Sequence, residues 1–383
     1  MAENTQYLVS ARRFRPKVFD EVIGQAHISR TLTNAINENR IHHAYLFTGP
    51  RGVGKTTSAR IYAREVIRKG LEEAGKDIDV SKLEDLDIIE IDGASNNSVE
   101  DIRTLRENSK YPPSIGKYKI YIIDEVHMLS KSAFNALLKT LEEPPAHLLF
   151  VFATTEPHKV PATIISRCQR FDFLRMSIDN MVSQLKMIAD KDNIKIEDSA
   201  LLTIAKKADG SMRDSQSIFD QAVAFCGKDI KYKDLASALN LIDEDFYFKI
   251  TDNMINKDIA GMFDIAKSIS ERGYDLRETV NGLIEHFRNM MAVKASSTIT
   301  LEASENAKNK YKETIPKFHN YDLIRILNLL VESDKNIRTS TQPNIVFELC
   351  LVALANMDST EELSKIISYI ENDLETIKKK ALN

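Results

Sequence analysis

A glycine-rich stretch near the N-terminus has the spacing of a phosphate-binding loop. Residues 49–56 read Gly-Pro-Arg-Gly-Val-Gly-Lys-Thr, which fits the P-loop pattern G-x-x-x-x-G-K-[ST]. Glycines let the backbone turn its N–H groups toward an anion, and the start of the next helix adds partial positive charge. Lys55 is expected to reach the β- and γ-phosphates, and Thr56 to ligate Mg²⁺. The residues expected at the phosphates are Gly49, Gly52, Val53, Gly54, Lys55, Thr56 and Thr57.

The segments beside this loop support the same interpretation. An apolar run at 44–47 predicts a strand before it, and 57–66 predicts a helix after it. The alternative is a glycine-rich loop that matches the pattern by chance, but such a loop would not be expected to lie between a strand and a helix. The sequence therefore predicts a nucleoside triphosphate site.

A second motif supplies carboxylates. Residues 119–125, Lys-Ile-Tyr-Ile-Ile-Asp-Glu, form an apolar strand ending in two acids, a Walker B pattern. Asp124 is expected to hold Mg²⁺, and Glu125 to orient and polarise the attacking water. A solvated Asp-Glu turn is the ordinary alternative. It is disfavoured because the P-loop lysine precedes the motif by 124 − 55 = 69 residues and a buried carboxylate is costly unless paired.

A third buried strand, 148–153, ends in Thr-Thr-Glu-Pro at 154–157. A polar side chain at this tip, such as Thr155, is expected beside the γ-phosphate and Glu125. The alternative is a simple turn with no role in chemistry.

About five apolar strands alternate with helices as far as residue 175. We predict a parallel sheet covered on both faces, with the nucleotide at the carboxyl ends of its strands. Pro16 favours an extended lead-in at 7–24. The strand pattern ends near Met176: short helices follow over 176–240, and 243–383 is helical, with breaks at Pro316 and Pro343 and an apolar stripe at Leu323, Ile326, Leu327 and Leu330.

Composition sets further bounds. A net charge of −4 over 383 residues gives no global basic field for nucleic acid. Three widely spaced cysteines argue against a disulfide framework and favour a reducing compartment. No apolar run approaches the roughly 20 residues of a membrane span, and the N-terminus lacks a signal-peptide core. We expect a cytoplasmic protein without membrane contact.

The motifs, in this order, resemble an AAA+ ATPase, and more closely the bacterial DNA polymerase III γ/τ clamp-loader family. The resemblance is strong over 7–240 and weaker over 243–383. It rests on the stretches 13–25, 40–47, 123–129, 134–145 and 153–157 and on Ser166-Arg-Cys168, which is similar to the clamp-loader signature.

The resemblance implies three domains: a RecA-like AAA+ ATPase domain at 1–175, a small helical lid at 176–240, and at 243–383 a helical collar that assembles a pentamer. Arg167 would be the finger that reaches the γ-phosphate of a neighbouring subunit; pairing with a local carboxylate is the alternative. Arg213 would be the lid arginine that senses the γ-phosphate within the chain, and Thr155 the sensor at the strand tip. The adenine side of the pocket would be lined by Arg15, Pro16, Val22 and Ile23.

The resemblance also implies partners: δ- and δ′-like loader subunits, a sliding clamp and primer-template DNA. In the family, helix starts facing a central chamber hold DNA phosphates. Arg103, Lys139 and Thr163 fall near those places, but each has the alternative of being a solvated surface residue. Such contacts would follow the DNA backbone without reading its sequence.

Two departures from the family pattern stand out. Residues 64–90 contain neither Cys nor His, so the usual four-cysteine zinc module cannot form there, and we expect no zinc. The fold of 68–85 stays open. The printed sequence ends after the expected collar, so we do not expect the helicase and polymerase contacts of the longer family form.

The sequence thus predicts an ATP- and Mg²⁺-dependent motor subunit that opens a sliding clamp and places it on primer-template DNA during DNA replication. One alternative is another AAA+ machine, such as a hexameric Holliday-junction motor, which the Ser166–Cys168 signature and 134–145 argue against. The other is a scaffold that binds nucleotide without hydrolysis. The set Lys55, Thr56, Asp124 and Glu125 argues against that alternative.

Overall fold

The structure is a computed structural model that describes residues 9–75, 87–239, 242, 244–295, 305–358 and 360. The chain forms two compact units, Met1–Leu235 and Ala236–Asn383. All the predicted chemical motifs fall in the first unit. The proposed replacement for the zinc module lies partly outside the described residues, as does the predicted helix end at 377–383.

A five-stranded parallel sheet forms the centre of the first unit, in the order β2-β3-β4-β1-β5. Its central strands β1 and β4 are buried along their whole length because both faces of the sheet are covered. The predicted α/β fold is confirmed. The strands are β1 (Ala44–Thr48), β2 (Ile88–Asp92), β3 (Lys119–Asp124), β4 (Leu148–Thr154) and β5 (Gln169–Asp172).

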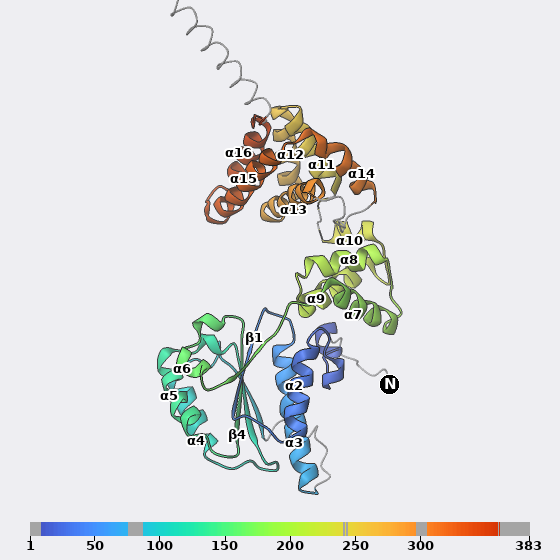
Figure 1. The fold of residues 1–383 in the computed structure, drawn as a ribbon. Helices are drawn as coiled ribbons and strands as arrows, with labels where there is room; N and C mark the ends of the chain where they lie inside the picture. The colour runs from blue at the N-terminus through green and yellow to red at the C-terminus, as the bar shows by residue number, and fades with distance from the viewer. Residues whose placement is uncertain are drawn as a thin grey trace, which may run out of the picture. The chain divides into compact units, whose positions relative to one another are not determined.

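Helices cover the two faces of this sheet in separate sets (Figure 1). One apolar layer joins the sheet to α2 (Ala26–Asn37) and α3 (Lys55–Glu73). The other joins it to α4 (Val99–Ser109), α5 (Lys131–Glu142) and α6 (Ala162–Ile165). Ser98 and Ser130 cap the starts of α4 and α5 by accepting backbone N–H groups.

Short turns complete this part of the chain. The lead-in was predicted to be extended. Residues 15–17 belong to no helix or strand, but the segment begins with α1 (Ser10–Arg13) and contains the 3₁₀ turn η1 (Phe19–Glu21). Two further 3₁₀ turns follow strands of the sheet: η3 (Val126–Met128) after β3 and η4 (Pro157–Lys159) after β4.

The lid region is mainly helical, as predicted. Its helices are α7 (Ile178–Lys191), α8 (Asp198–Lys207), α9 (Met212–Cys226) and α10 (Tyr232–Ala238). The prediction that strands end near Met176 was wrong in one detail. Lys195–Ile196 (β6) pairs in parallel with Asp229–Ile230 (β7), and segments of two residues are too short to give a periodic pattern.

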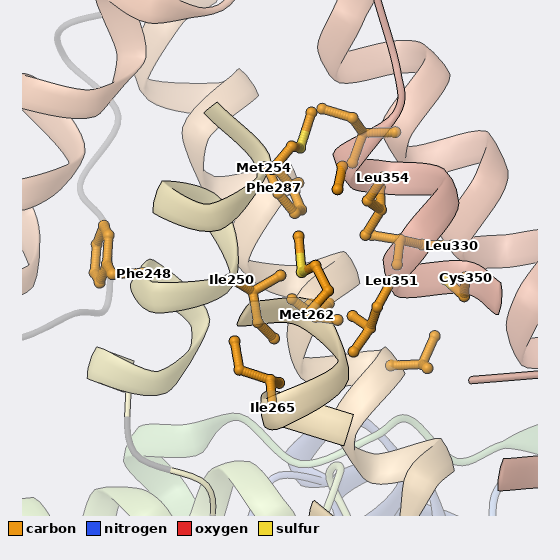
Figure 2. Close-up of a cluster of buried hydrophobic side chains, with 14 of the residues drawn as sticks. Phe248, Ile250, Met254, Met262, Ile265, Phe287, Leu330, Cys350, Leu351 and Leu354 are labelled. Carbon is orange, nitrogen blue, oxygen red and sulfur yellow. The ribbon is translucent and has the colours of Figure 1, made fainter. Parts of the chain in front are cut away.

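The second unit is helical throughout its described part. It comprises α11 (Glu244–Ile255), α12 (Ile259–Arg272), α13 (Leu276–Ala295), α14 (Glu305–Thr314), the 3₁₀ turn η5 (Ile315–Lys317), α15 (Asn320–Thr339) and α16 (Pro343–Ala355). One apolar core joins these helices, and Figure 2 shows part of it around Met262 and Leu351. The predicted stripe on α15 is confirmed, since Leu323, Ile326 and Leu330 are fully buried. Pro316 and Pro343 stand at breaks between helices, as predicted.

Among the described residues, no helix combines the length and apolar character that a membrane crossing requires.

Candidate active site

The loop between β1 and α3 has the backbone that the P-loop pattern requires. Gly49, Gly52 and Gly54 all have positive φ angles, of 141°, 73° and 100°. A Cβ atom at Gly49 would overlap the backbone of Phe173, and one at Gly52 would overlap the Ser211 side chain. Glycine is therefore needed at both positions for conformation and for space.

Lys55 begins α3 and points back into this loop. Its Nζ donates to the carbonyl oxygens of Gly49, at 2.8 Å, and Pro50, at 2.6 Å. Burial lowers the pKa of Lys55, while Glu125 and Asp124 act in the opposite direction. A buried ammonium held in a glycine loop is suited to bind an anion with strong negative charge.

The first two motifs meet at the carboxyl ends of β1 and β3. Thr56 Oγ1 donates to Asp124 Oδ2 at 2.6 Å. A hydroxyl and a carboxylate in contact form the kind of oxygen ligand set that Mg²⁺ prefers. Both residues were predicted from the sequence as Mg²⁺ ligands, and that role stays a prediction.

Glu125 stands beside this pair in a strained conformation. Its φ and ψ are both 45°, a left-handed region that non-glycine residues seldom adopt. Its Oε2 accepts from the backbone N–H of Thr155 at 3.3 Å and from Thr155 Oγ1 at 3.1 Å. Backbone strain of this kind often occurs at functional sites, and here it presents a carboxylate to the tip of β4.

A pocket extends from these groups toward the N-terminal lead-in and the lid. It is lined by most of the predicted nucleotide residues, together with others that no motif of the sequence indicated. The predicted ones are Arg15, Pro16, Val22, Ile23, Gly52, Gly54, Lys55, Thr56, Thr57, Asp124, Glu125 and Arg213. The additional ones are Ala11, Phe14, Glu21, Arg51, Met176, Gln184, Met212 and Gln216.

Long-range contacts bring the lead-in and the lid to this pocket. Ser10 donates through its backbone N–H to Asp220 of α9 at 2.8 Å, and Arg13 pairs with Asp192 at the end of α7. The start of α9 touches the P-loop, where the Arg213 N–H donates to the Gly52 carbonyl at 3.4 Å. The start of the lid helix α9 is therefore in direct contact with the P-loop backbone.

Four of the residues predicted for ATP binding and hydrolysis do not line this pocket. Gly49 packs against Phe173, and Val53 is fully buried in the apolar layer beside α3. The Thr155 hydroxyl donates to Glu125, which does line the pocket. The fourth residue is Arg167.

Arg167 lies just beyond α6 and is bound within its own chain. Its guanidinium donates to Glu142 Oε1 of α5 and to the Thr163 carbonyl, at 2.7 and 2.8 Å. In the single chain Arg167 thus pairs with a local carboxylate, which was the stated alternative to a role in a neighbouring subunit. The adjacent Cys168 packs against the apolar layer of α5 and α6, and burial raises the pKa of its thiol to about 12.

The three predicted DNA contacts lie on the helices that cover one face of the sheet. All three side chains belong to exposed residues, and Arg103 is 3.9 Å from Glu100. Thr163 is at the start of α6 and Arg103 is in the second turn of α4. The expectation of a helix start was wrong for Lys139, which lies in the last turn of α5.

Comparison with known sequences places this site in a family. Three family models match consecutive parts of the chain: "DNA polymerase III, delta subunit" over 24–177, "DNA polymerase III clamp loader subunit, ATPase lid domain" over 180–228, and "DNA polymerase III subunits gamma and tau domain III" over 230–369. DNA polymerase III subunit tau of Bacillus subtilis is 38% identical over 390 residues, covering 97% of this chain and 69% of that protein. The chain belongs to the DNA polymerase III gamma/tau family.

Other members of the family differ in length. The gamma subunit of Buchnera aphidicola subsp. Baizongia pistaciae is 33% identical, with 92% of this chain matching 98% of that protein. The tau subunit of Escherichia coli is 37% identical, but the match covers only 50% of its length and 81% of this chain. The family assignment makes this chain a clamp-loader ATPase subunit, as the sequence predicted.

Among solved structures, the RuvB Holliday junction branch migration motor of Thermotoga maritima matches with a TM-score of 0.48 and 21% identity. The match covers 67% of this chain and 85% of that one.

Proposed function

We propose that this clamp-loader ATPase subunit binds and hydrolyses ATP to open a sliding clamp and place it on primer-template DNA. The observation that carries the proposal is the meeting of three separate motifs in one pocket. The pocket is lined by Lys55 and Thr56 of the P-loop, by Asp124 at the end of β3 with Glu125 directly after it, and by Arg213 of the lid. These are the groups that phosphoryl transfer to water requires.

Each side chain has a distinct task in this proposal. Lys55 binds the β- and γ-phosphates, and Arg213 senses the γ-phosphate from the lid. Glu125, held by Thr155, orients and polarises the attacking water. Thr56 and Asp124 provide oxygens that fit a magnesium ion, and Mg²⁺ bound there would offset the phosphate charge.

Arg167 has its role in a neighbouring subunit's site. It is not among the residues that line its own chain's pocket, which supports action on another subunit. To act there, its guanidinium must leave Glu142, and since both side chains are partly exposed this ion pair costs at most about 1 kcal/mol to break. A finger of this kind is worth roughly 10³–10⁵ in rate.

The rest of the chain is assigned on the same basis. We divide it into an ATPase domain at 1–175, a lid at 176–240 and a collar at 243–383, a division that the three family matches support. The collar joins δ- and δ′-like subunits in a pentamer. Arg103, Lys139 and Thr163 face DNA phosphates in that assembly.

We place the protein in the bacterial cytoplasm, at the nucleoid during replication, because its relatives are bacterial replication subunits.

The test is the ATPase rate of the assembled loader with and without clamp and primed DNA. We expect strong stimulation when both are present, because DNA then aligns Arg167 with the adjoining site. A rate indifferent to clamp and DNA would contradict the proposal. The native mass of the complex distinguishes this assembly from a ring motor, since we expect five subunits and a branch-migration motor would have six.

A further inference from the structure

A histidine that none of the three motifs uses lies between two carboxylates at the edge of the site. The His127 side chain is only 6% exposed. Its Nδ1 is 3.4 Å from Glu125 Oε2, and its Nε2 is 3.4 Å from Glu156 Oε1. The ring thus separates the proposed catalytic carboxylate from a second acid.

The local fold explains this position. The chain turns sharply at Glu125, and the 3₁₀ turn η3 then carries His127 back toward the end of β4. There Nδ1 lies 3.0 Å from Oγ1 of Thr154, a fully buried residue. Glu125 and His127 therefore contact neighbouring threonines: Glu125 contacts Thr155, and His127 contacts Thr154.

A hydrogen bond to Thr154 anchors the ring from a third direction. Thr154 Oγ1 accepts from the Glu156 N–H at 3.0 Å and lies 3.0 Å from Nδ1 of His127. Because Thr154 belongs to β4 and is fully buried, this contact ties the ring to the sheet.

Glu156 is kept charged by its other neighbours. Lys159 Nζ donates to Glu156 Oε1 at 2.9 Å, and this hydrogen bond lowers the pKa of Glu156. His158 also faces this carboxylate, with Nε2 3.5 Å from Oε2. Glu156 is thus held in place, and its contact with Nε2 of His127 helps to fix the ring.

We propose that His127 is a positioning residue for hydrolysis, holding Glu125 in its strained conformation against the Thr155 donors. The buried ring contacts Glu125 Oε2 on one side and Glu156 Oε1 on the other, so it fills the space into which the Glu125 side chain would otherwise turn. Glu125 is thereby kept against the backbone N–H and the hydroxyl of Thr155. The inference rests on the proposed role of Glu125.

His286 of the second unit provides a structural contrast. It is also buried, but its ring nitrogens contact Thr251 and Tyr311, at 3.0 Å each, and no carboxylate is among these hydrogen-bond partners. A histidine of that kind stabilises a core. His127 lies beside two acids at the end of a strained turn, which indicates a role in the chemistry.

The experiment compares variants in the loader assembled with clamp and primed DNA. We expect His127→Ala to lower kcat by up to about 100-fold with the KM for ATP unchanged, because a catalytic group misplaced by about 1 Å loses that much. His127→Asn keeps a polar group near the position of Nδ1, so it should recover part of the loss. His27→Asn, which alters an exposed histidine of α2, should behave as wild type.

Binding of a fluorescent ATP analogue and thermal unfolding establish that each variant is folded. If His127→Ala does not fold, the comparison of His127→Asn with wild type decides. A kcat unchanged in the folded variants, or a loss that appears only in KM, would overturn the proposal. Lys55→Ala and Glu125→Gln are run in parallel: if these also kept full turnover, the proposed function itself would be wrong.

Discussion

At the scale of single residues, the site depends on charged groups that are buried or partly buried and that have hydrogen-bond partners. Lys55 contacts two loop carbonyls, and Asp124 accepts from Thr56. Each group is thus held in place before a nucleotide arrives, and such preorganised electrostatics commonly contributes more to catalysis than any other single effect.

Lys55→Ala should abolish turnover while leaving the fold intact. We expect the ATPase rate to fall by at least about 100-fold, because the main cation at the phosphates is lost. Far-ultraviolet circular dichroism should be unchanged, since burial already disfavours the charged amine.

The matched control is Lys69→Ala. Lys69 lies on the same helix and also donates to two backbone carbonyls, those of Ile36 and Asn37, but outside the pocket. Its loss should leave the rate unchanged. Persistent turnover in Lys55→Ala would mean that the phosphate site is assigned to the wrong loop.

At the scale of elements, the sequence predicted what depends on local pattern and parallel topology. Apolar runs indicated the strands, and the motifs were predicted to gather at the carboxyl ends of parallel strands, which is where Thr56 and Asp124 lie in contact. Contacts between distant segments could not be predicted in this way. Ser10 meets Asp220 across 210 positions, and Met176 and Gln184 reach the pocket only because the lid folds over it.

A role for His127 was not predicted, for a related reason. It lies in the stretch 123–129 that resembles the family. Its partners are distant in sequence: Thr154 ends the neighbouring strand of the sheet, and Glu156 follows that strand. Only the structure brings them together.

Gly49→Ala should lower the free energy of unfolding of the first unit, because Gly49 packs against Phe173 beside the ends of β1 and β5. The substitution combines an unfavourable φ of 141° with overlap on Phe173, and we expect a loss of about 1–3 kcal/mol in the free energy of unfolding. Urea unfolding followed by circular dichroism measures it. Gly75→Ala, where φ is 63° with nothing nearby, isolates the conformational part and should cost less. Equal losses would contradict the role of the Phe173 contact.

Acid should weaken the second unit through His286. Burial lowers its pKa from 6.5 to about 3, so the unfolded chain binds a proton more readily than the folded chain between these values. Stability from this group is complete above pH 6.5 and falls as pH drops toward 3, at up to about 1.4 kcal/mol per pH unit.

The measurement is the free energy of unfolding from urea titrations between pH 7 and pH 5. Because the chain has no tryptophan, circular dichroism is the suitable signal. His286→Gln should be less stable at pH 7 but show a shallower decline with acid. An identical slope in the variant would mean that other groups control the acid response.

At the scale of the whole molecule, hydrolysis is proposed to be a property of the assembly. Lys55, Thr56, Asp124 and Glu125 line one pocket, while Arg167 lies outside it and pairs with Glu142. On the proposal above, one subunit binds the nucleotide, and hydrolysis is fast only when a neighbour contributes its guanidinium.

The most direct test is the ATPase rate per chain, measured for the dilute single chain and for the loader assembled with clamp and primed DNA, with Arg167 intact or replaced by alanine. We predict slow turnover by the single chain, fast turnover by the assembly, and a loss of roughly 10³-fold or more in the Arg167→Ala assembly with ATP binding retained. Arg170→Ala, which alters an exposed arginine of β5, should keep the wild-type rate. Full-speed hydrolysis by the dilute single chain, insensitive to Arg167→Ala, would contradict this account.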